Sequence, residues 1–251
     1  MTVTADARHR SHREIWRQKA VLREVYGHLY RRMVSACVPG LTVEIGGGSG
    51  NFKEFAPHTV SLDIVAAPWL DLVADAQFLP FATGSVHNLV MLDVLHHIEY
   101  PLRFFHEAAR VLAPGGRVIA IEPGMSLVST PFYRLFHEEP VDRSADPLID
   151  GTPTGGKDPY NGNQAIPTLL ATRDRARMAR LAPELRLIRG DWLSLAAYPM
   201  SGGFQHWSLL SAGAARQLLR IEDLLCPFIG RLCGFRMLLV WQRSLHPDKD
   251  R

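Results

Sequence analysis

Glycines follow a short apolar run at a spacing that suits a nucleotide-like ligand. Residues 41–45 are typical of a buried strand, and Gly46, Gly48 and Gly50 come directly after them. Glycines in a turn permit positive φ and let a ligand approach the backbone where a Cβ would block it. A helix beginning near Asn51 would direct its free N–H groups towards that ligand. We therefore predict a ligand-binding turn directly after this strand.

The glycine spacing separates two classes of cofactor. A dinucleotide fold requires Gly-x-Gly-x-x-Gly, whose third glycine lets the helix pack closely on the strand. Asn51 stands at that third position, and the sequence reads Glu-x-Gly-x-Gly-x-Gly from Glu44. This form resembles motif I of the class I S-adenosylmethionine (SAM)-dependent methyltransferases. A nicotinamide-dependent oxidoreductase is therefore the less favoured alternative, and a non-catalytic SAM-binding protein is a third.

The resemblance continues through an ordered series of motifs over residues 41–123. Asp63 ends the next apolar run about 17 residues after Gly46, where a carboxylate would accept hydrogen bonds from ribose hydroxyls. Asp75 is similar to the family acid that meets the adenine amino group, and residues 110–123, RVLAPGGRVIAIEP, are similar to a family signature. The resemblance is to bacterial type 11-like methyltransferases, and it implies SAM as cofactor. The cofactor contacts it implies are Glu44, Gly46, Gly48, Gly50, Asp63, Ile64, Asp75, Ala76 and Asp93.

Histidines supply the candidate bases. A hydroxyl acceptor must lie in line with the S–C bond of the cofactor and must lose a proton, and histidine is the commonest proton acceptor near neutrality. His96 and His97 follow a predicted strand at residues 87–92, where the resembled family lines the acceptor side. His206, beside Trp207, and His137, beside Glu138, are second-rank bases. A structural or cofactor-shaping role for the two adjacent rings stays open.

Potential metal ligands are sparse in the sequence. Asp93 and Glu122, at two predicted strand ends, would suit a metal-dependent catechol site, but we find no convincing third ligand. Cys37, Cys226 and Cys233 lack the pairing of metal ligands and are too few for a disulfide framework. We therefore expect no metal and a reducing, cytoplasmic location.

Alternating strand and helix patterns predict one α/β domain. We expect a Rossmann-like, seven-stranded, mostly parallel sheet with helices on both faces, and the 47% hydrophobic content of the 251 residues supports a sizeable core. Further strands are expected at residues 118–122, 185–193 and, antiparallel, 235–242, with helices at 101–112 and 168–182. The predicted parts are an N-terminal helical cap (1–36), a SAM-binding core (37–122), a substrate loop insertion (123–167) and a second lid insertion (194–233).

The two insertions are expected to hold the acceptor. Their candidate substrate-binding side chains are Tyr133, His137, Tyr198 and Trp207. Aromatic rings among polar side chains suit a sugar, which stacks on one face and is hydrogen-bonded at its hydroxyls. Residues 162–168 and 198–204 also resemble bacterial methyltransferases associated with glycan biosynthesis. We therefore predict O-methylation of a sugar hydroxyl on a glycan, glycolipid or glycosylated metabolite. The alternative is C-methylation of a quinone or other small aromatic metabolite, because the core also resembles the ubiquinone and menaquinone methyltransferases.

Charge and hydropathy limit the partners. The formal charge of +3 is mild, although residues 8–32 are basic, and no nucleic-acid-binding module is recognised. No apolar run approaches the ~18 residues that span a bilayer, so we expect no transmembrane segment.

An apolar stripe recurs at helical spacing at Leu218, Ile221, Leu225, Phe228 and Leu232. Packing against the sheet is its favoured interpretation, and docking on a membrane or partner is the alternative. The oligomeric state is not predicted.

Overall fold

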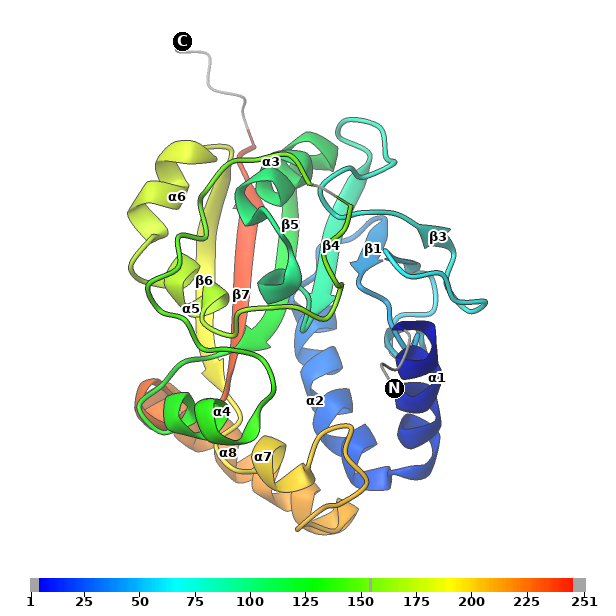
Figure 1. Ribbon diagram of the computed structural model, residues 1–251, viewed down its shortest axis with the longest axis vertical. Coiled ribbons are helices and arrows are strands. Elements are labelled where there is room, and N and C mark those ends of the chain that lie inside the picture. The colour runs from blue at the N-terminus through cyan, green and yellow to red at the C-terminus, as the bar shows by residue number, and fades with distance from the viewer. Residues whose placement is uncertain (1–4, 154, 246–251) are drawn as a thin grey trace.

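A seven-stranded sheet forms the centre of the protein (Figure 1). The computed structural model describes residues 5–153 and 155–245, so residues 1–4 of the predicted cap lie outside it. The strand order is β3-β2-β1-β4-β5-β7-β6, and only the two pairings of β7 are antiparallel. The strands are β1 (Thr42–Ile45), β2 (Val60–Asp63), β3 (Leu72–Val73), β4 (Val86–Leu92), β5 (Leu112–Pro123), β6 (Leu185–Leu193) and β7 (Arg236–Arg243). The predicted fold class is confirmed.

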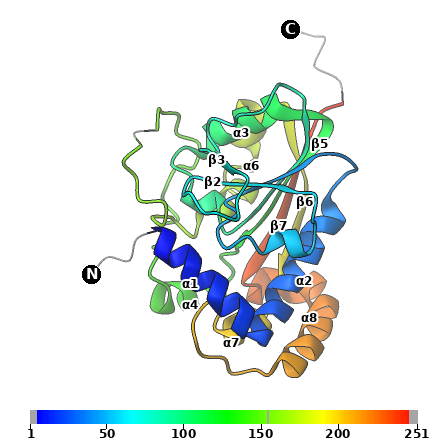
Figure 2. The ribbon, with the colours of Figure 1, turned by 90° about the vertical axis from the view of Figure 1, so that its right-hand side faces the viewer.

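Helices cover both faces of this sheet (Figure 2). They are α1 (Ala5–Gln18), α2 (Ala20–Ala36), α3 (Pro101–Val111), α4 (Ser129–Phe136), α5 (Ile166–Ala171), α6 (Arg175–Leu181), α7 (Ala197–Ser201) and α8 (Ala212–Cys233), with 3₁₀ turns η1 (Phe52–Glu54) and η2 (Leu95–His97). Successive residues of a strand point to opposite faces. Val118 and Ala120 of β5 accordingly join the core under α3, whereas Ile119 and Ile121 join the core under α1, α2 and α8.

Two predicted helices differ in the structure. The helix expected near Asn51 is only the three-residue turn η1, because Pro57 follows and disfavours helical geometry in the residue before it. The helix expected at residues 168–182 is two helices, α5 and α6. Thr172 leaves helical geometry between them, and its hydroxyl donates to the carbonyl of Thr168, a local bond that competes with the helical pattern.

The expected packing of the α8 stripe against the sheet is wrong. The buried row of α8 is Ala215, Leu219, Glu222, Cys226 and Gly230, at three- and four-residue spacing. The residues of the predicted stripe beyond Leu218 are exposed: Ile221, Leu225, Phe228 and Leu232. The reason is that Gly230 lies directly against Trp192 of β6, so this smaller row faces the sheet and the larger side chains point outwards.

α1 and α2 are separated by a tight break at Lys19. Its backbone is extended, and its ammonium group donates to the carbonyls of Gly203, Gln205 and Trp207 at 2.7–2.8 Å. Lys19 thereby ties the segment between α7 and α8 to the N-terminal helices. α1 lies beside the carboxyl ends of β1 and β2, where Arg13 contacts Ser49 and His9 faces Asp63.

Candidate active site

The glycines after β1 have three different surroundings. Gly46, Gly48 and Gly50 all have positive φ, a backbone conformation that is strained in residues with a side chain. A Cβ at Gly46 would lie 2.2 Å from Val94, and one at Gly50 would lie 2.6 Å from Trp69. A Cβ at Gly48 would meet nothing nearer than 3.7 Å. Gly46 and Gly50 therefore permit close packing of the turn, and Gly48 is the glycine whose backbone a ligand can approach.

An acid on each of the first two strands lies beside this turn. Asp63, at the end of β2, accepts the N–H of Gly48 on Oδ2 and that of Val65 on Oδ1, both at 2.9 Å. Glu44 is buried and accepts the Ser61 hydroxyl, and burial raises its pKa to about 7. Glu44 therefore contacts its neighbouring strand, whereas Asp63 stands at the edge of the turn.

α1 covers the turn with residues that the sequence did not single out. The buried His9 places Nε2 3.9 Å from Asp63 Oδ2, and its ring meets that of Tyr160 edge-on. Arg13 donates to the Ser49 carbonyl at 2.7 Å and lies over the ring of Trp69. Because His9 and Tyr160 come from α1 and the first insertion, these two parts meet above Asp63.

Beyond β3, the predicted adenine-side residues form a local turn. Asp75 accepts the backbone N–H of Gln77 at 2.8 Å and also contacts its side-chain amide. Ala76 is buried, and Ile64, just after β2, is exposed. Asp75 thus stabilises its own turn. A ligand would meet a carboxylate that still has lone pairs to accept a hydrogen bond.

Asp93 ends β4 in a rare conformation. Its φ of 59° lies in the left-handed region, which a non-glycine residue adopts at an energetic cost. Its carboxylate pairs with the fully buried guanidinium of Arg236 at the start of β7. Arg236 lies over the ring of Tyr198, 4.8 Å from its centroid. Tyr198 is therefore part of a polar cluster around the buried Arg236 at the carboxyl edge of the sheet.

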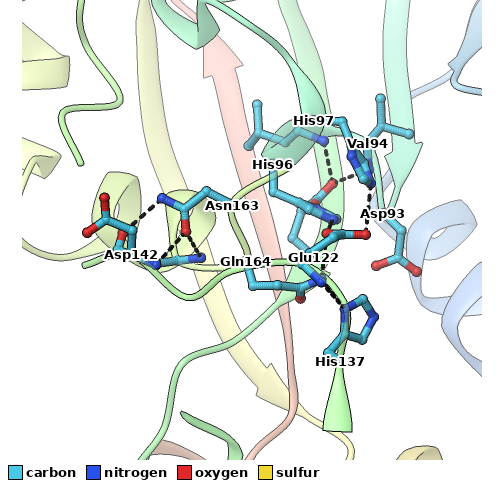
Figure 3. A network of polar contacts seen from close by, with 12 residues as sticks. Asp93, Val94, His96, His97, Glu122, His137, Asp142, Asn163 and Gln164 are labelled. Carbon is cyan, nitrogen blue, oxygen red and sulfur yellow. Dashed lines mark hydrogen bonds and ion pairs between the residues drawn. The ribbon is translucent and has the colours of Figure 1, made fainter. Parts of the chain in front are cut away.

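The turn after Asp93 directs backbone and side-chain donors at one buried carboxylate. Glu122, at the end of β5, accepts the N–H groups of Val94 and Leu95 at 2.9 and 2.8 Å, and His96 Nδ1 lies 2.5 Å from its other oxygen (Figure 3). On the opposite side, His96 Nε2 is 3.1 Å from Glu139. His96 is thus held between two carboxylates through both ring nitrogens.

These contacts determine the charges. Burial lowers the pKa of His96, but the two carboxylates outweigh it and raise that pKa to about 9. Burial raises the pKa of Glu139, but the bond and charge of His96 bring it down to about 2. At neutral pH His96 is therefore an imidazolium whose protons are already donated, and this arrangement disfavours it as a base.

His97 is in the opposite state. Burial, with the charge of His96, lowers its pKa to about 4, so the ring is neutral at pH 7. Its Nε2 is 3.7 Å from Glu139, and its Nδ1 has no hydrogen-bond partner among the described residues. A neutral imidazole with an unused nitrogen is able to accept a proton.

The first insertion closes over both histidines. The N–H of Asn163 donates to the His96 carbonyl at 3.0 Å, and Lys157 donates to the His97 carbonyl. Gln164 donates to Glu139 at 2.7 Å and contacts His137, and Figure 3 shows this arm of the network reaching Asp142 through Asn163. A Cβ at Gly162 would lie 2.8 Å from His97 Nδ1. The insertion therefore surrounds His97 with polar groups.

Three predicted site residues lie elsewhere. Tyr133 is buried in a small core, and its hydroxyl donates to the Phe235 carbonyl, so it supports the site from within. His206 and Trp207 are exposed on the segment that Lys19 holds, and no described contact joins them to His97. Their sequence position beside each other suggested a second base, but the break at Lys19 holds this segment against the N-terminal helices instead.

Two groups of side chains bring potential metal-ligating atoms within 4.8 Å of one another. They are His96, His97 and Glu139, and Asp93, His96 and Glu122. The second set adds His96 to Asp93 and Glu122, as a third potential ligand that the sequence did not reveal. In each set, however, the carboxylates already face a cation, either the His96 imidazolium or Arg236.

Comparisons with known proteins agree with this geometry. Residues 43–120, from β1 into β5, match the family model described as a methyltransferase domain. A comparison with curated proteins found no match.

Solved structures share the fold. A SAM-dependent methyltransferase from Archaeoglobus fulgidus superposes with a TM-score of 0.54 at 11% identity, over 88% of this chain and 94% of that one. A possible histamine N-methyltransferase from Thermotoga maritima gives 0.52 at 16%, over 92% and 94%. A geranyl diphosphate C-methyltransferase from Streptomyces coelicolor, solved with Mg²⁺, geranyl diphosphate and S-adenosyl-L-homocysteine, gives 0.51 at 14%, over 87% and 81%.

The cofactor class follows from the turn and the matched segment together. The turn offers an open backbone at Gly48 and a carboxylate at the end of β2, and it leads into a three-residue 3₁₀ turn. A pyrophosphate would require a true helix end there, whereas a cofactor without phosphate does not. With its glycine turn, Asp63 and both histidines inside the matched methyltransferase domain, the chain is a SAM-dependent methyltransferase.

Proposed function

We propose that this enzyme O-methylates a sugar hydroxyl and that His97 is the general base. The observation that carries the proposal is the neutral, unpartnered Nδ1 of His97 beside the charged His96. His96 would be a positioning residue, because it holds Glu139, whose carboxylate lies next to His97 Nε2. A cytoplasmic location belongs to the proposal and agrees with the three free cysteines.

The proposed reaction balances without further reagents. SAM supplies an electrophilic methyl group, whose bond to sulfur breaks with its electron pair left on sulfur as the acceptor oxygen bonds to the methyl carbon. As that bond forms, the acceptor O–H becomes strongly acidic, so even an imidazole of lowered pKa can take its proton. His97 Nδ1 would receive it while Nε2–H faces Glu139.

The cofactor would lie over the glycine turn. We propose that Gly48 meets it through its backbone, that Asp63 accepts hydrogen bonds from its ribose hydroxyls, and that Ile64, Asp75 and Ala76 border its adenine. Among the described residues, Asp63 accepts hydrogen bonds from two backbone N–H groups, and its carboxylate can accept further bonds from hydroxyl donors. His9 and Tyr160 would cover the ribose from above.

The surroundings of His97 favour a sugar over a quinone. Glu139, Lys157 and Tyr160 contact it, Gln164 donates to Glu139, and all four are groups that pair with hydroxyls. These groups already have partners within the protein, and a prenylated quinone, unlike a sugar, would bring few hydrogen-bonding groups to their remaining donor and acceptor sites. C-methylation of a quinone or small aromatic remains the alternative proposal.

The direct test is transfer of a radiolabelled methyl group from SAM into a cell extract fractionated into glycan, lipid, protein, nucleic-acid and small-metabolite pools. We expect label in the glycan or glycolipid pool. Label confined to apolar quinones would replace this proposal with the alternative.

The matched variant for this test is Asp63→Ala. Loss of a hydrogen bond to a charged group is worth about 1.5–3 kcal/mol, so SAM affinity should fall roughly 10- to 150-fold. Isothermal titration with SAM measures it, and Asp191→Ala, which removes an ion pair with Arg189 on β6, should bind SAM normally. Unchanged affinity in Asp63→Ala would contradict the proposed ribose contact.

Gly162→Ala tests the space beside His97. The new Cβ would lie 2.8 Å from His97 Nδ1 and 3.1 Å from Glu139, so it should block proton transfer while leaving the glycine turn untouched. We expect turnover to fall at least about tenfold with SAM affinity unchanged. Gly156→Ala, where a Cβ has no neighbour within 4 Å, is the control. Full turnover in Gly162→Ala would place the reacting groups elsewhere.

A further inference from the structure

The outward face of α8 is apolar over three turns. Phe228 is 83% exposed, Leu224 73% and Ile221 52%, and Leu225 and Leu232 are also exposed. We define these five residues as the α8 face. The other side of the same helix, the smaller row with Leu219 and Cys226, is buried against the sheet and α2. The large apolar side chains of α8 therefore point away from the core, on the side where a surface helix is normally polar.

The α8 face continues onto a neighbouring segment. The N–H of Val128 donates to the Leu232 carbonyl at 3.1 Å, which holds the chain before α4 beside the end of α8. Leu127 and Val128 are exposed there. An exposed apolar surface of this extent marks an interaction site on a folded protein.

The charges around the α8 face are of one sign. Arg220 and Arg231 are exposed along one margin. Of the two acids in the same stretch, Glu222 is buried and accepts the N–H groups of Ala196 and Ala197, and Asp223, whose side chain is 37% exposed, is paired with Arg32 and lies 3.1 Å from His28. The face is therefore apolar with a cationic margin, and neither carboxylate between residues 220 and 232 is both exposed and unpaired.

We propose that the α8 face docks on an anionic lipid bilayer. Apolar side chains entering the headgroup boundary, with arginines beside them on anionic headgroups, are the features of an interfacial helix. A second copy of the chain fits less well, because a two-fold contact would bring the arginine margins together with no carboxylates on the face to neutralise them. No helix of the described residues is long and apolar enough to cross a membrane, so the contact is a surface one.

The position of the face gives the docking a consequence. α8 leads directly into Arg236, which binds Asp93 at the carboxyl edge of the sheet, and Figure 1 shows α4, α7 and α8 together at that end. Docking would bring the acceptor side to the bilayer, as an acceptor carried on a lipid requires. The inference goes beyond the proposed sugar acceptor and does not depend on it.

Vesicle co-sedimentation of the full chain, without SAM or acceptor, tests the inference separately from activity. We expect binding to vesicles of phosphatidylcholine mixed with phosphatidylglycerol, weakened by salt, and at least about tenfold weaker partition to phosphatidylcholine alone. The double variants Phe228→Gln/Leu224→Gln and Arg220→Gln/Arg231→Gln should each lose about tenfold or more. Ile188→Gln, an exposed apolar residue of β6, is the matched control.

Two outcomes would overturn the proposal. One is the absence of binding, or equal binding to neutral and anionic vesicles. The other is a dimer in sedimentation equilibrium that Phe228→Gln dissociates, which would assign the α8 face to a second copy. All the substituted side chains are exposed, and thermal unfolding of each variant verifies that it folds as the parent does.

Discussion

Replacing His97 by alanine should lower kcat by about 10²- to 10⁴-fold, the range typical of losing a general base. SAM affinity should be unchanged, because the glycine turn and Asp63 lie on other strand ends. Single-turnover rates with saturating SAM, together with isothermal titration, measure the two effects. His206→Ala, on the exposed segment held by Lys19, should keep full activity. Equal turnover in His97→Ala and the parent would remove His97 from the mechanism.

The dependence of kcat/KM on pH gives a second test of His97 as the general base. Because the pKa of His97 is lowered to about 4, the base is unprotonated at all pH values well above 4, and kcat/KM should fall only as the pH drops towards that value. The ordinary pKa of a free histidine would instead place the acid limb near 6.5. An acid limb near 6.5 in the parent enzyme would contradict a buried, neutral His97.

Replacing Glu122 by glutamine should have the largest effect on stability. Glu122 is fully buried and accepts three hydrogen bonds, from Val94, Leu95 and His96. Breaking a buried ion pair by removing one charge costs about 3–5 kcal/mol, because the other charge is left without its partner. Urea unfolding measures the loss. Glu138→Gln, which changes an exposed neighbour of the network, should stay within about 0.5 kcal/mol of the parent.

The ion pair also makes stability depend on pH in a defined direction. The pKa of His96 is raised to about 9 in the folded state, so its stabilising contribution is complete below the unfolded value near 6.5 and is lost as the pH rises through 9. Parent protein should therefore lose stability between pH 6.5 and 9.5, and Glu122→Gln should lose much less over that interval. Equal slopes in the two proteins would show that Glu122 does not hold the proton on His96.

The α8 stripe shows why one-dimensional patterns leave burial undecided. Its spacing predicts an apolar helix face, but α8 has a second row of Ala215, Leu219, Cys226 and Gly230 that packs on the sheet. Gly230 allows contact with Trp192 that a larger residue would prevent, so the smaller row is buried and Phe228 is exposed. Which of two apolar faces is buried depends on the shape of the partner, and no local pattern contains that shape.

The sequence by itself determined the fold class and the cofactor, and it predicted the turn proposed to bind that cofactor. These follow from local signals, because each strand has its own apolar run and the residues Gly46 to Asn51 are contiguous. Only the tertiary structure decided which histidine is free. His96 and His97 are adjacent and chemically identical, but Glu122, 26 residues away, and Glu139 in the first insertion hold one ring charged and leave the other neutral. A pKa is set by burial and by charges within a few ångströms, and those neighbours are brought together only when distant segments fold onto one sheet edge.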